Sequence, residues 1–212
     1  KYALEQVSIN IRAGELIGVV GESGAGKSTL VDLILGLLAP TKGSIKVDGI
    51  DIHQNLKSWQ RQLGYVPQHI YLTDDSVRRN VAFGVKEEDI NESNVFRAIN
   101  AAQLGDLISD LPENIETIVG ERGVRLSGGQ RQRIGIARAL YHNPKVLIFD
   151  EATSALDQET ESEVMSTIES LHGEKTIIIV THRLKTLSDC DRIYEFKAGR
   201  LIGAGSYEDV AK

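Results

Sequence analysis

A glycine-rich loop between an apolar run and a helical pattern is the feature that most constrains the fold of this chain. Leu16 to Val20 is a continuous apolar run, as expected for a central strand that is covered on both faces. The loop Gly21–Ser28 follows at once and matches the pattern G-x-x-x-x-G-K-[ST], and residues 29–35 then carry a helical period that ends near Gly36. This order of strand, loop and helix predicts an α/β core.

The same loop has the chemistry of a phosphate site. Glycines let backbone N–H groups turn toward a phosphate, and the start of the following helix adds a favourable dipole. Lys27 is expected to reach the β- and γ-phosphates of a nucleotide, and the Ser28 hydroxyl is expected to bind Mg²⁺. The residues predicted to contact the nucleotide are Gly21, Glu22, Ser23, Gly24, Ala25, Gly26, Lys27, Ser28 and Thr29.

Two adjacent carboxylates end a second apolar strand, predicted over residues 146–149. Open α/β sheets bind ligands at the carboxyl ends of their strands. Asp150 is therefore predicted to hold the Mg²⁺ shell, and Glu151 to polarise the attacking water as general base. An apolar strand with a terminal Asp-Glu pair is common, so the pair gains its meaning from the glycine-rich loop.

A third run, Leu-Ser-Gly-Gly-Gln at residues 126–130, opens a predicted helix that runs toward Leu140. It supplies a hydroxyl, bare backbone and a helix N-terminus, which an anion site needs. Such a site would be redundant if it faced the nucleotide of its own chain, so it is inferred to face a nucleotide held by another copy. In isolation, the run is equally well explained as a serine N-cap followed by flexible glycines.

The remaining periodicities describe one α/β domain with an inserted helical block. With 212 residues, the chain is predicted to have a core over about residues 1–69 and 141–212 and a helical subdomain over about 70–140. Further strands are predicted at 7–11, 45–49, 64–67, 176–180 and 192–196, and helical periods at 77–81, 95–102 and 130–140.

Composition excludes several classes of protein. The net charge of −6 argues against a nucleic-acid binder, which normally has a basic face. Cys190 is the only cysteine, which excludes disulfides and cysteine-based metal sites. No apolar run approaches the ~18 residues that span a bilayer. The chain opens without a signal-peptide pattern and is interpreted as part of a longer protein.

In these runs and their spacing, the chain resembles the nucleotide-binding domain of ATP-binding-cassette (ABC) transporters over nearly all of its length. The loop, residues 126–130, Asp150-Glu151 and the Ser154-Ala155-Leu156-Asp157 run match that family in order. The resemblance implies a P-loop NTPase core of the RecA-like type, with an antiparallel β subdomain and an inserted α-helical subdomain. It also implies two domains paired head to tail around two ATP molecules with Mg²⁺. Each site would then join the loop of one copy to Ser127, Gly128, Gly129 and Gln130 of the other.

Three single residues gain a role only through this resemblance. Gln68 is similar to a glutamine that contacts Mg²⁺ and water, and His182 resembles the histidine that contacts the γ-phosphate. Asp157 resembles a residue that crosses the dimer interface near the nucleotide. By themselves, His182 is better explained as a structural residue and Asp157 as an ordinary helix-start aspartate. The predicted catalytic residues are Lys27, Glu151 and His182, and the predicted metal-binding residues are Ser28, Gln68 and Asp150.

Two segments, residues 76–84 and 117–123, are similar to exporters within the family. The resemblance implies a transmembrane domain as partner, placement at the cytoplasmic face of a membrane, and export of a substrate, with lipids or lipid-linked sugars among the candidates. Exporters carry an adenine-stacking aromatic residue before the segment that matches Ala3-Leu4. Its strand and the transmembrane domain are therefore expected outside this chain, which would weaken nucleotide binding by the chain alone.

Two other classes of cassette fit the sequence less well. A DNA-repair or chromosome-maintenance ATPase would insert a long coiled coil between the loop and residues 126–130, where this chain has no sustained heptads. A ribosome-acting protein would carry two cassettes and a charged linker. A cassette that only binds nucleotide would lack the catalytic set, whereas Glu151 and His182 are both present. The transported substrate stays open. The choice between identical and mixed pairs is not fixed by the sequence, but the complete catalytic set favours a pair of identical copies that forms on ATP binding.

Overall fold

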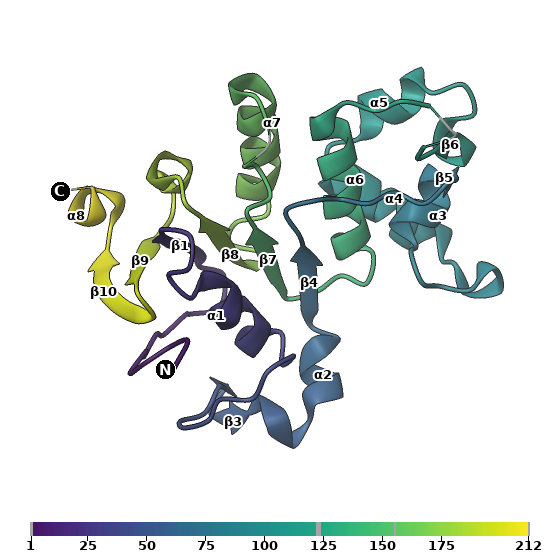
Figure 1. Ribbon diagram of the computed structural model, residues 1–212. Coiled ribbons are helices and arrows are strands. Elements are labelled where there is room, and N and C mark those ends of the chain that lie inside the picture. The colour runs from purple at the N-terminus through teal and green to yellow at the C-terminus, as the bar shows by residue number, and fades with distance from the viewer. Residues whose placement is uncertain (1, 122–123, 155, 212) are drawn as a thin grey trace. The chain divides into compact units, whose positions relative to one another are not determined.

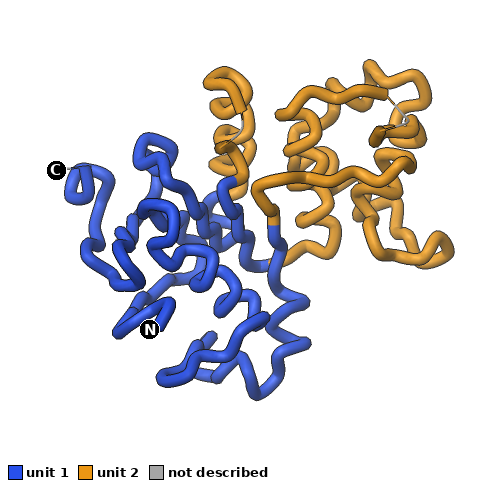
Figure 2. Tube along the Cα trace, in the orientation of Figure 1, with its two compact units in different colours: residues 1–65, 145–151, 172–212 blue, residues 66–144, 152–171 orange. Residues whose placement is uncertain are grey.

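The computed structural model describes residues 2–121, 124–154 and 156–211. The chain groups into two compact units, shown in different colours in Figure 2. Unit 1 comprises residues 1–65, 145–151 and 172–212, and unit 2 comprises residues 66–144 and 152–171. Segment 152–171 thus groups with the helical part of the chain, whereas the sequence predicts that about residues 141–212 belong to the core.

A mostly parallel sheet forms the centre of unit 1 and confirms the α/β prediction (Figure 1). Within the described residues it has six strands in the order β10-β9-β1-β8-β7-β4. Strand β1 pairs in parallel with β8 and β9, β7 pairs in parallel with β8, and β10 runs antiparallel to β9. The strands are β1 (Leu16–Gly21), β4 (Leu63–Val66), β7 (Val146–Asp150), β8 (Thr176–Thr181), β9 (Arg192–Lys197) and β10 (Arg200–Gly205).

The register of the parallel strands places the predicted site residues at one edge of the sheet. Val20 of β1 lies opposite Thr181 of β8, and Asp150 of β7 lies opposite Val180. The loop after β1 and the residues that follow β7 and β8 therefore leave the sheet side by side. This edge, at the carboxyl ends of the strands, is where open α/β sheets bind ligands.

Helix α1 (Lys27–Ile34) packs against β1 and β7 and closes one face of the sheet. Its inward side chains, Leu30 and Val31, are buried with apolar residues from four neighbouring strands. Each such side chain contributes about 1.5–3 kcal/mol relative to an exposed one. The strand residues of this cluster are Ile17, Val19, Ile148, Ile178, Val180, Tyr194 and Phe196. Tight packing of this kind holds the strand ends in fixed positions.

The short helix α2 (Leu56–Gln60) caps the far end of α1 with two side chains. The Trp59 indole N–H donates to the carbonyl of Ile34 at 2.6 Å, and the Gln60 amide donates to the carbonyl of Leu35 at 3.1 Å. The last carbonyls of a helix have no partner within the helix, so these two bonds satisfy groups that would otherwise need water. Helix α2 thereby fixes the C-terminal end of the helix that follows the glycine-rich loop.

Replacing Trp59 with phenylalanine is expected to lower the free energy of unfolding by about 1–3 kcal/mol, because it removes the indole bond and part of a buried ring. Trp59 is only 8% exposed, whereas Gln60 is exposed, so Gln60→Ala should cost clearly less. Urea unfolding followed by circular dichroism measures both variants. Equal costs for the two would show that the indole bond contributes little.

The predicted strand over residues 7–11 is wrong, because no strand is formed there within the described part of the chain. Its side chains do alternate as expected, with Val7, Ile9 and Ile11 partly buried against the main core. The Tyr194 hydroxyl, however, donates to the Asn10 carbonyl at 2.6 Å and accepts from the Asn10 N–H at 3.3 Å. A side chain thus occupies backbone groups that a neighbouring strand would have bonded.

Unit 1 also contains short elements away from the main sheet. Strands β2 (Lys46–Val47) and β3 (Ile50–Asp51) form an antiparallel pair, which agrees with a short strand over residues 45–49 that runs into another. The remaining helices of the unit are η1 (Ile52–Gln54), η4 (Leu184–Leu187) and α8 (Tyr207–Val210).

Unit 2 is built mainly from helices packed around α6 (Gly128–Leu140), which contacts α3, α4 and α7. The predicted helical periods are confirmed at α3, α4 and α6, whereas the antiparallel pair β5–β6 was not expected because each strand has only two residues. No helix in the described ranges is both long and apolar enough to cross a membrane. The other elements are β5 (Asp75–Ser76), α3 (Val77–Val81), η2 (Glu87–Asp89), α4 (Glu92–Ala101), α5 (Gly105–Asp110), η3 (Asn114–Glu116), β6 (Ile118–Val119) and α7 (Gln158–Glu169).

Candidate functional site

The loop between β1 and α1 has the backbone that the glycine pattern predicts. Gly24 and Gly26 have φ of +77° and +104°, in the left-handed region that favours glycine. Gly26 is the N-cap of α1 and supplies no side-chain capping bond, and the first turn of the helix carries no acidic residue. The first N–H groups of α1 are therefore suited to an external anion.

Lys27 lies under this loop rather than in solvent. Its side chain is only 6% exposed, and its ammonium donates to the carbonyls of Gly21 at 2.7 Å and Glu22 at 3.0 Å. These bonds hold the positive charge against the turn that would surround a phosphate. The arrangement fits the role predicted for Lys27, because the ammonium can exchange neutral carbonyls for phosphate oxygens.

Asp150 ends β7 next to a tyrosine to which no sequence motif assigns a role. The Tyr65 hydroxyl donates to the Asp150 carboxylate at 3.3 Å. Burial raises the pKa of Asp150, while the bond from Tyr65 acts in the opposite direction. Burial and the nearby Asp150 charge raise the pKa of Tyr65 to about 12, so the phenol stays a donor at neutral pH. The only signal in the sequence was the position of Tyr65 on a strand predicted to be short.

Glu151 has an unusual backbone for a residue with a side chain. Its φ is +50°, and its N–H donates to the carbonyl of Val180 at 2.8 Å, which ties the turn to β8. Strained backbone of this kind costs of order 1–3 kcal/mol and is concentrated at functional sites. A Glu151 carboxylate oxygen lies 3.5 Å from Nδ1 of His182. The two predicted catalytic side chains that follow β7 and β8 are therefore in direct contact.

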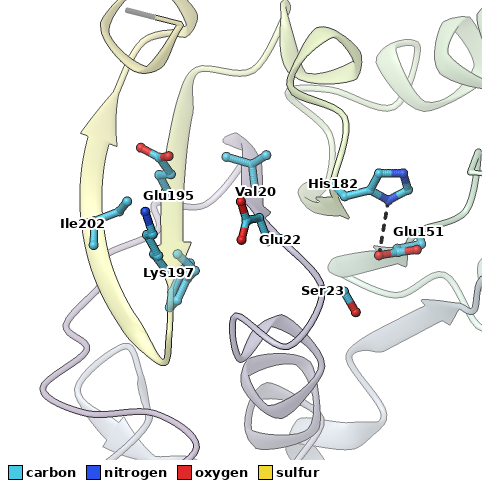
Figure 3. A pocket seen from close by; sticks show the side chains of 10 residues that line it. Val20, Glu22, Ser23, Glu151, His182, Glu195, Lys197 and Ile202 are labelled. Atoms are coloured by element: carbon cyan, nitrogen blue, oxygen red, sulfur yellow. Dashed lines mark ion pairs between the residues drawn. The ribbon is translucent and has the colours of Figure 1, made fainter.

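An open cavity of about 680 Å³ in unit 1 brings the start of the loop together with Glu151 and His182, whereas Lys27, Ser28 and Asp150 are not among the residues that line it (Figure 3). Glu151 and His182 face each other on one side of it, Glu22 and Ser23 of the loop lie next to them, and strands β9 and β10 line the opposite side. The lining residues are Val20, Gly21, Glu22, Ser23, Glu151, His182, Glu195, Phe196, Lys197 and Ile202. The loop, a carboxylate and a histidine thus surround a space large enough for phosphate groups.

The predicted magnesium ligands fit the chemistry of that ion in part. Mg²⁺ prefers oxygen donors and is usually held by one or two carboxylates together with substrate phosphates. Ser28 lies in the first turn of α1, which packs against β7, and Asp150 ends β7, so a hydroxyl and a carboxylate are available in unit 1. Across the described residues, no group of three or more His, Cys, Asp or Glu side chains is placed to hold a metal ion.

In unit 2, the start of α6 shows the capping that was one of the two interpretations of residues 126–130. The Ser127 hydroxyl accepts from the Gln130 N–H at 3.2 Å, and the Gln130 side chain accepts from the Ser127 N–H at 2.9 Å. Gly129 is buried against α7, where a Cβ atom would collide with the side chain of Thr160. The geometry thus accounts for Ser127, Gly129 and Gln130 structurally, and their contact with a nucleotide stays a prediction.

Two further predicted residues of unit 2 have structural partners. The Asp157 carboxylate caps α7 by accepting from the Thr160 N–H at 3.1 Å and the Thr160 hydroxyl at 2.8 Å, and these bonds lower the pKa of Asp157. The Gln68 amide donates to the Ser154 hydroxyl at 3.0 Å, which links it to the run that contains Asp157. Ala155 of that run, and Arg122 and Gly123 of the exporter-like segment, lie outside the described residues.

Comparisons with known proteins agree with this arrangement. The family model described as ABC transporter matches residues 4–154, more than half of the chain. The ATP-dependent lipid A-core flippases of Ralstonia nicotianae and Cupriavidus metallidurans are 40% and 44% identical to this chain over 212 residues, which is 99% of it and 36% of each flippase. The ABC transporter ATM1 of Toxoplasma gondii is 39% identical over 211 residues, 99% of this chain and 18% of that protein.

A solved structure gives the same result for the fold. It is that of a bacterial Atm1-family ABC exporter with ATP bound, which matches with a TM-score of 0.86 and 41% identity over 98% of this chain and 36% of that one. The chain spans about a third or less of these relatives. The P-loop NTPase fold and the predicted resemblance are thereby confirmed. The matched family model, together with the glycine-rich loop and the strand ends that it covers, shows that the chain belongs to the ABC transporter family.

Proposed function

We propose that this chain is the ATP-binding and ATP-hydrolysing motor domain of an ABC exporter. The observation that carries the proposal is the cavity of unit 1, in which the glycine-rich loop, Glu151 and His182 meet. The names of the relatives, which include flippases and an exporter with ATP bound, support both ATP as the nucleotide and transport as the outcome.

The side chains of unit 1 divide the work of phosphoryl transfer to water. Lys27 and the N–H groups of the loop bind the phosphates, and the Ser28 hydroxyl and the Asp150 carboxylate hold Mg²⁺, which neutralises charge on the phosphates when bound. Glu151 accepts a proton from the attacking water. His182, at 3.5 Å from Glu151, donates toward the γ-phosphate. Gln68 is assigned to the magnesium shell on the family resemblance alone.

The groups of unit 2 serve a second copy of the domain. In the proposed head-to-tail dimer, Ser127, Gly128, Gly129 and Gln130 contact the nucleotide held by the partner's loop, and Asp157 lies near the same interface. In the capping bond the Ser127 hydroxyl acts as an acceptor, and a hydroxyl also carries a proton that can be donated to an anion at this helix start. Closure on ATP and opening after hydrolysis would then drive a transmembrane domain at the cytoplasmic face of a membrane.

The class of exported substrate is supported only by the relatives. Several of them are named lipid A-core flippases, which favours a lipid or lipid-linked substrate, while others are named ATM1 or Atm1-family exporters. The acidic balance of the chain gives no support to a nucleic-acid partner.

The solution mass of the Glu151→Gln variant, with and without millimolar Mg²⁺-ATP, tests the proposal once ATP binding has been confirmed by titration. Removal of the general base should trap the closed state, so the mass is expected to double only with ATP. Glu195→Gln, which alters another carboxylate of the same cavity, is the matched control and should not accumulate the dimer. ATP binding without any change of mass would contradict self-pairing of this chain.

A further inference from the structure

Arg138, near the end of α6, connects that helix to the segment that follows Gln68. Its guanidinium donates from Nε to the Asn80 carbonyl at 2.9 Å, from Nη2 to the Asn80 side-chain oxygen at 3.0 Å, and from Nη1 to the Tyr71 carbonyl at 3.0 Å. It also lies 4.8 Å from the centre of the Phe83 ring, within the range of a cation–π contact. One side chain of α6 thus makes four contacts with residues 71–83.

Asn80 extends this connection along the chain. It is fully buried, and its amide donates to the carbonyls of Thr73, Asp75 and Ser76 at 3.1–3.3 Å. Its oxygen accepts from the N–H and the hydroxyl of Thr73 as well as from Arg138. Both ends of the buried amide are therefore bonded, so the backbone of residues 73–76 is held by the side chain that Arg138 also holds.

A second contact between the same two elements lies one turn earlier on α6. The Ile70 side chain packs so closely on Gly135 that a Cβ atom there would come within 3 Å of it. Gly135 and Arg138 are three positions apart and so lie on neighbouring parts of one helix face. Residues 70 and 71, just after Gln68, are therefore fixed to α6 by close packing and by a hydrogen bond.

The opposite end of α6 carries the candidate anion site. Its 13 residues form a rod of about 20 Å at 1.5 Å per residue, and Ser127 is its N-cap. A helix that is hydrogen-bonded throughout moves as a unit. A displacement of the segment after Gln68 therefore reaches residues 127–130 only through the contacts that attach this segment to α6.

We propose that Arg138 is a positioning residue that attaches the Gln68 segment to α6, so that residues 126–132 respond when nucleotide and Mg²⁺ engage Gln68. The inference rests on the proposed function for the role of Gln68. The planar fork of arginine is required, because a lysine ammonium reaches fewer of the three acceptors and stacks poorly on Phe83.

Hydrogen exchange in the full-length protein that contains this chain tests the proposal, in a Glu151→Gln background that keeps ATP bound. In that background, Mg²⁺-ATP should slow exchange in peptides covering residues 68–76 and 126–132. With Arg138→Met added, the change at 68–76 is expected to persist, while the change at 126–132 falls to less than half. Arg138→Lys should be intermediate, which keeps the test available if the methionine variant folds poorly.

Arg97→Met is the matched control, because Arg97 also donates to a backbone carbonyl in unit 2, that of Tyr141 at 2.9 Å, from a different helix. Arg97→Met should leave the slowing of exchange at residues 68–76 and at residues 126–132 unchanged.

With Glu151 intact, Arg138→Met should lower kcat about 3- to 30-fold with little change in KM for ATP. ATP binding to the unaltered protein is measured first and tests the proposed function separately. Two results would contradict the role of Arg138 as a positioning residue, provided that ATP binds. In the first, the Arg138 variants behave like Arg97→Met. In the second, they lose the exchange changes at residues 68–76 and 126–132 in equal proportion.

Discussion

Lys27→Met is expected to weaken binding of Mg²⁺-ATP about 10- to 150-fold, and hydrolysis at a fixed ATP concentration should fall with it. The estimate is that of a charge-assisted hydrogen bond, about 1.5–3 kcal/mol, at roughly 1.4 kcal/mol for each tenfold change. The ammonium is already held under the loop by the carbonyls of Gly21 and Glu22, so little side-chain freedom is lost when a phosphate binds. Isothermal titration with Mg²⁺-ATP measures the affinity of the variant.

Lys197 provides a matched control for this substitution. It also lines the cavity of unit 1, at the end of β9, but it is exposed and is not assigned a role in binding. Lys197→Met removes the same charge from the same cavity, so a comparable loss of affinity in both variants would mean that only the general positive potential matters. Melting temperatures should be compared as well, because the bonds from Lys27 also shape the loop.

The central sheet could be predicted from the sequence because it is buried. Strands covered on both faces are continuous apolar runs, and β1, β7 and β8 are found within a residue of the predicted bounds. The segment over residues 7–11 shows the limit of this reasoning. Alternation predicts which side chains are buried, but the backbone there bonds to the hydroxyl of Tyr194, a residue more than 180 positions away in the sequence.

The candidate site could be predicted from the sequence only as a set of residue types. The motif identifies Asp150 and Glu151, but neither the bond from Tyr65 nor the positive φ of Glu151 has a local sequence signal, since both depend on how neighbouring strands lie. Residues 127–130 are ambiguous for a different reason. Capping a helix and binding an anion use the same hydroxyl and N–H groups, so the sequence fits both, and the capping seen here rules out neither.

Glu151→Gln is expected to lower kcat for ATP hydrolysis about 10²- to 10⁴-fold, the usual contribution of a general base, with ATP affinity close to that of the unaltered protein. Glutamine keeps the length and shape of the side chain, so the unusual backbone at this position and the bond from its N–H to Val180 should be retained. What is lost is the proton acceptor, which lies 3.5 Å from His182 at the edge of the cavity. Phosphate release at saturating Mg²⁺-ATP measures kcat.

The comparison that decides the role of Glu151 is with Glu195→Gln, because Glu195 is the carboxylate that lines the same cavity from β9. Either substitution removes one negative charge from the lining of the cavity, whereas of the two carboxylates only Glu151 follows β7 and contacts His182. A loss of kcat confined to Glu151→Gln therefore identifies a positioned base rather than a field effect. If Glu151→Gln retained more than about a tenth of the rate, well above the range for a lost general base, the proton would have to be accepted by another group.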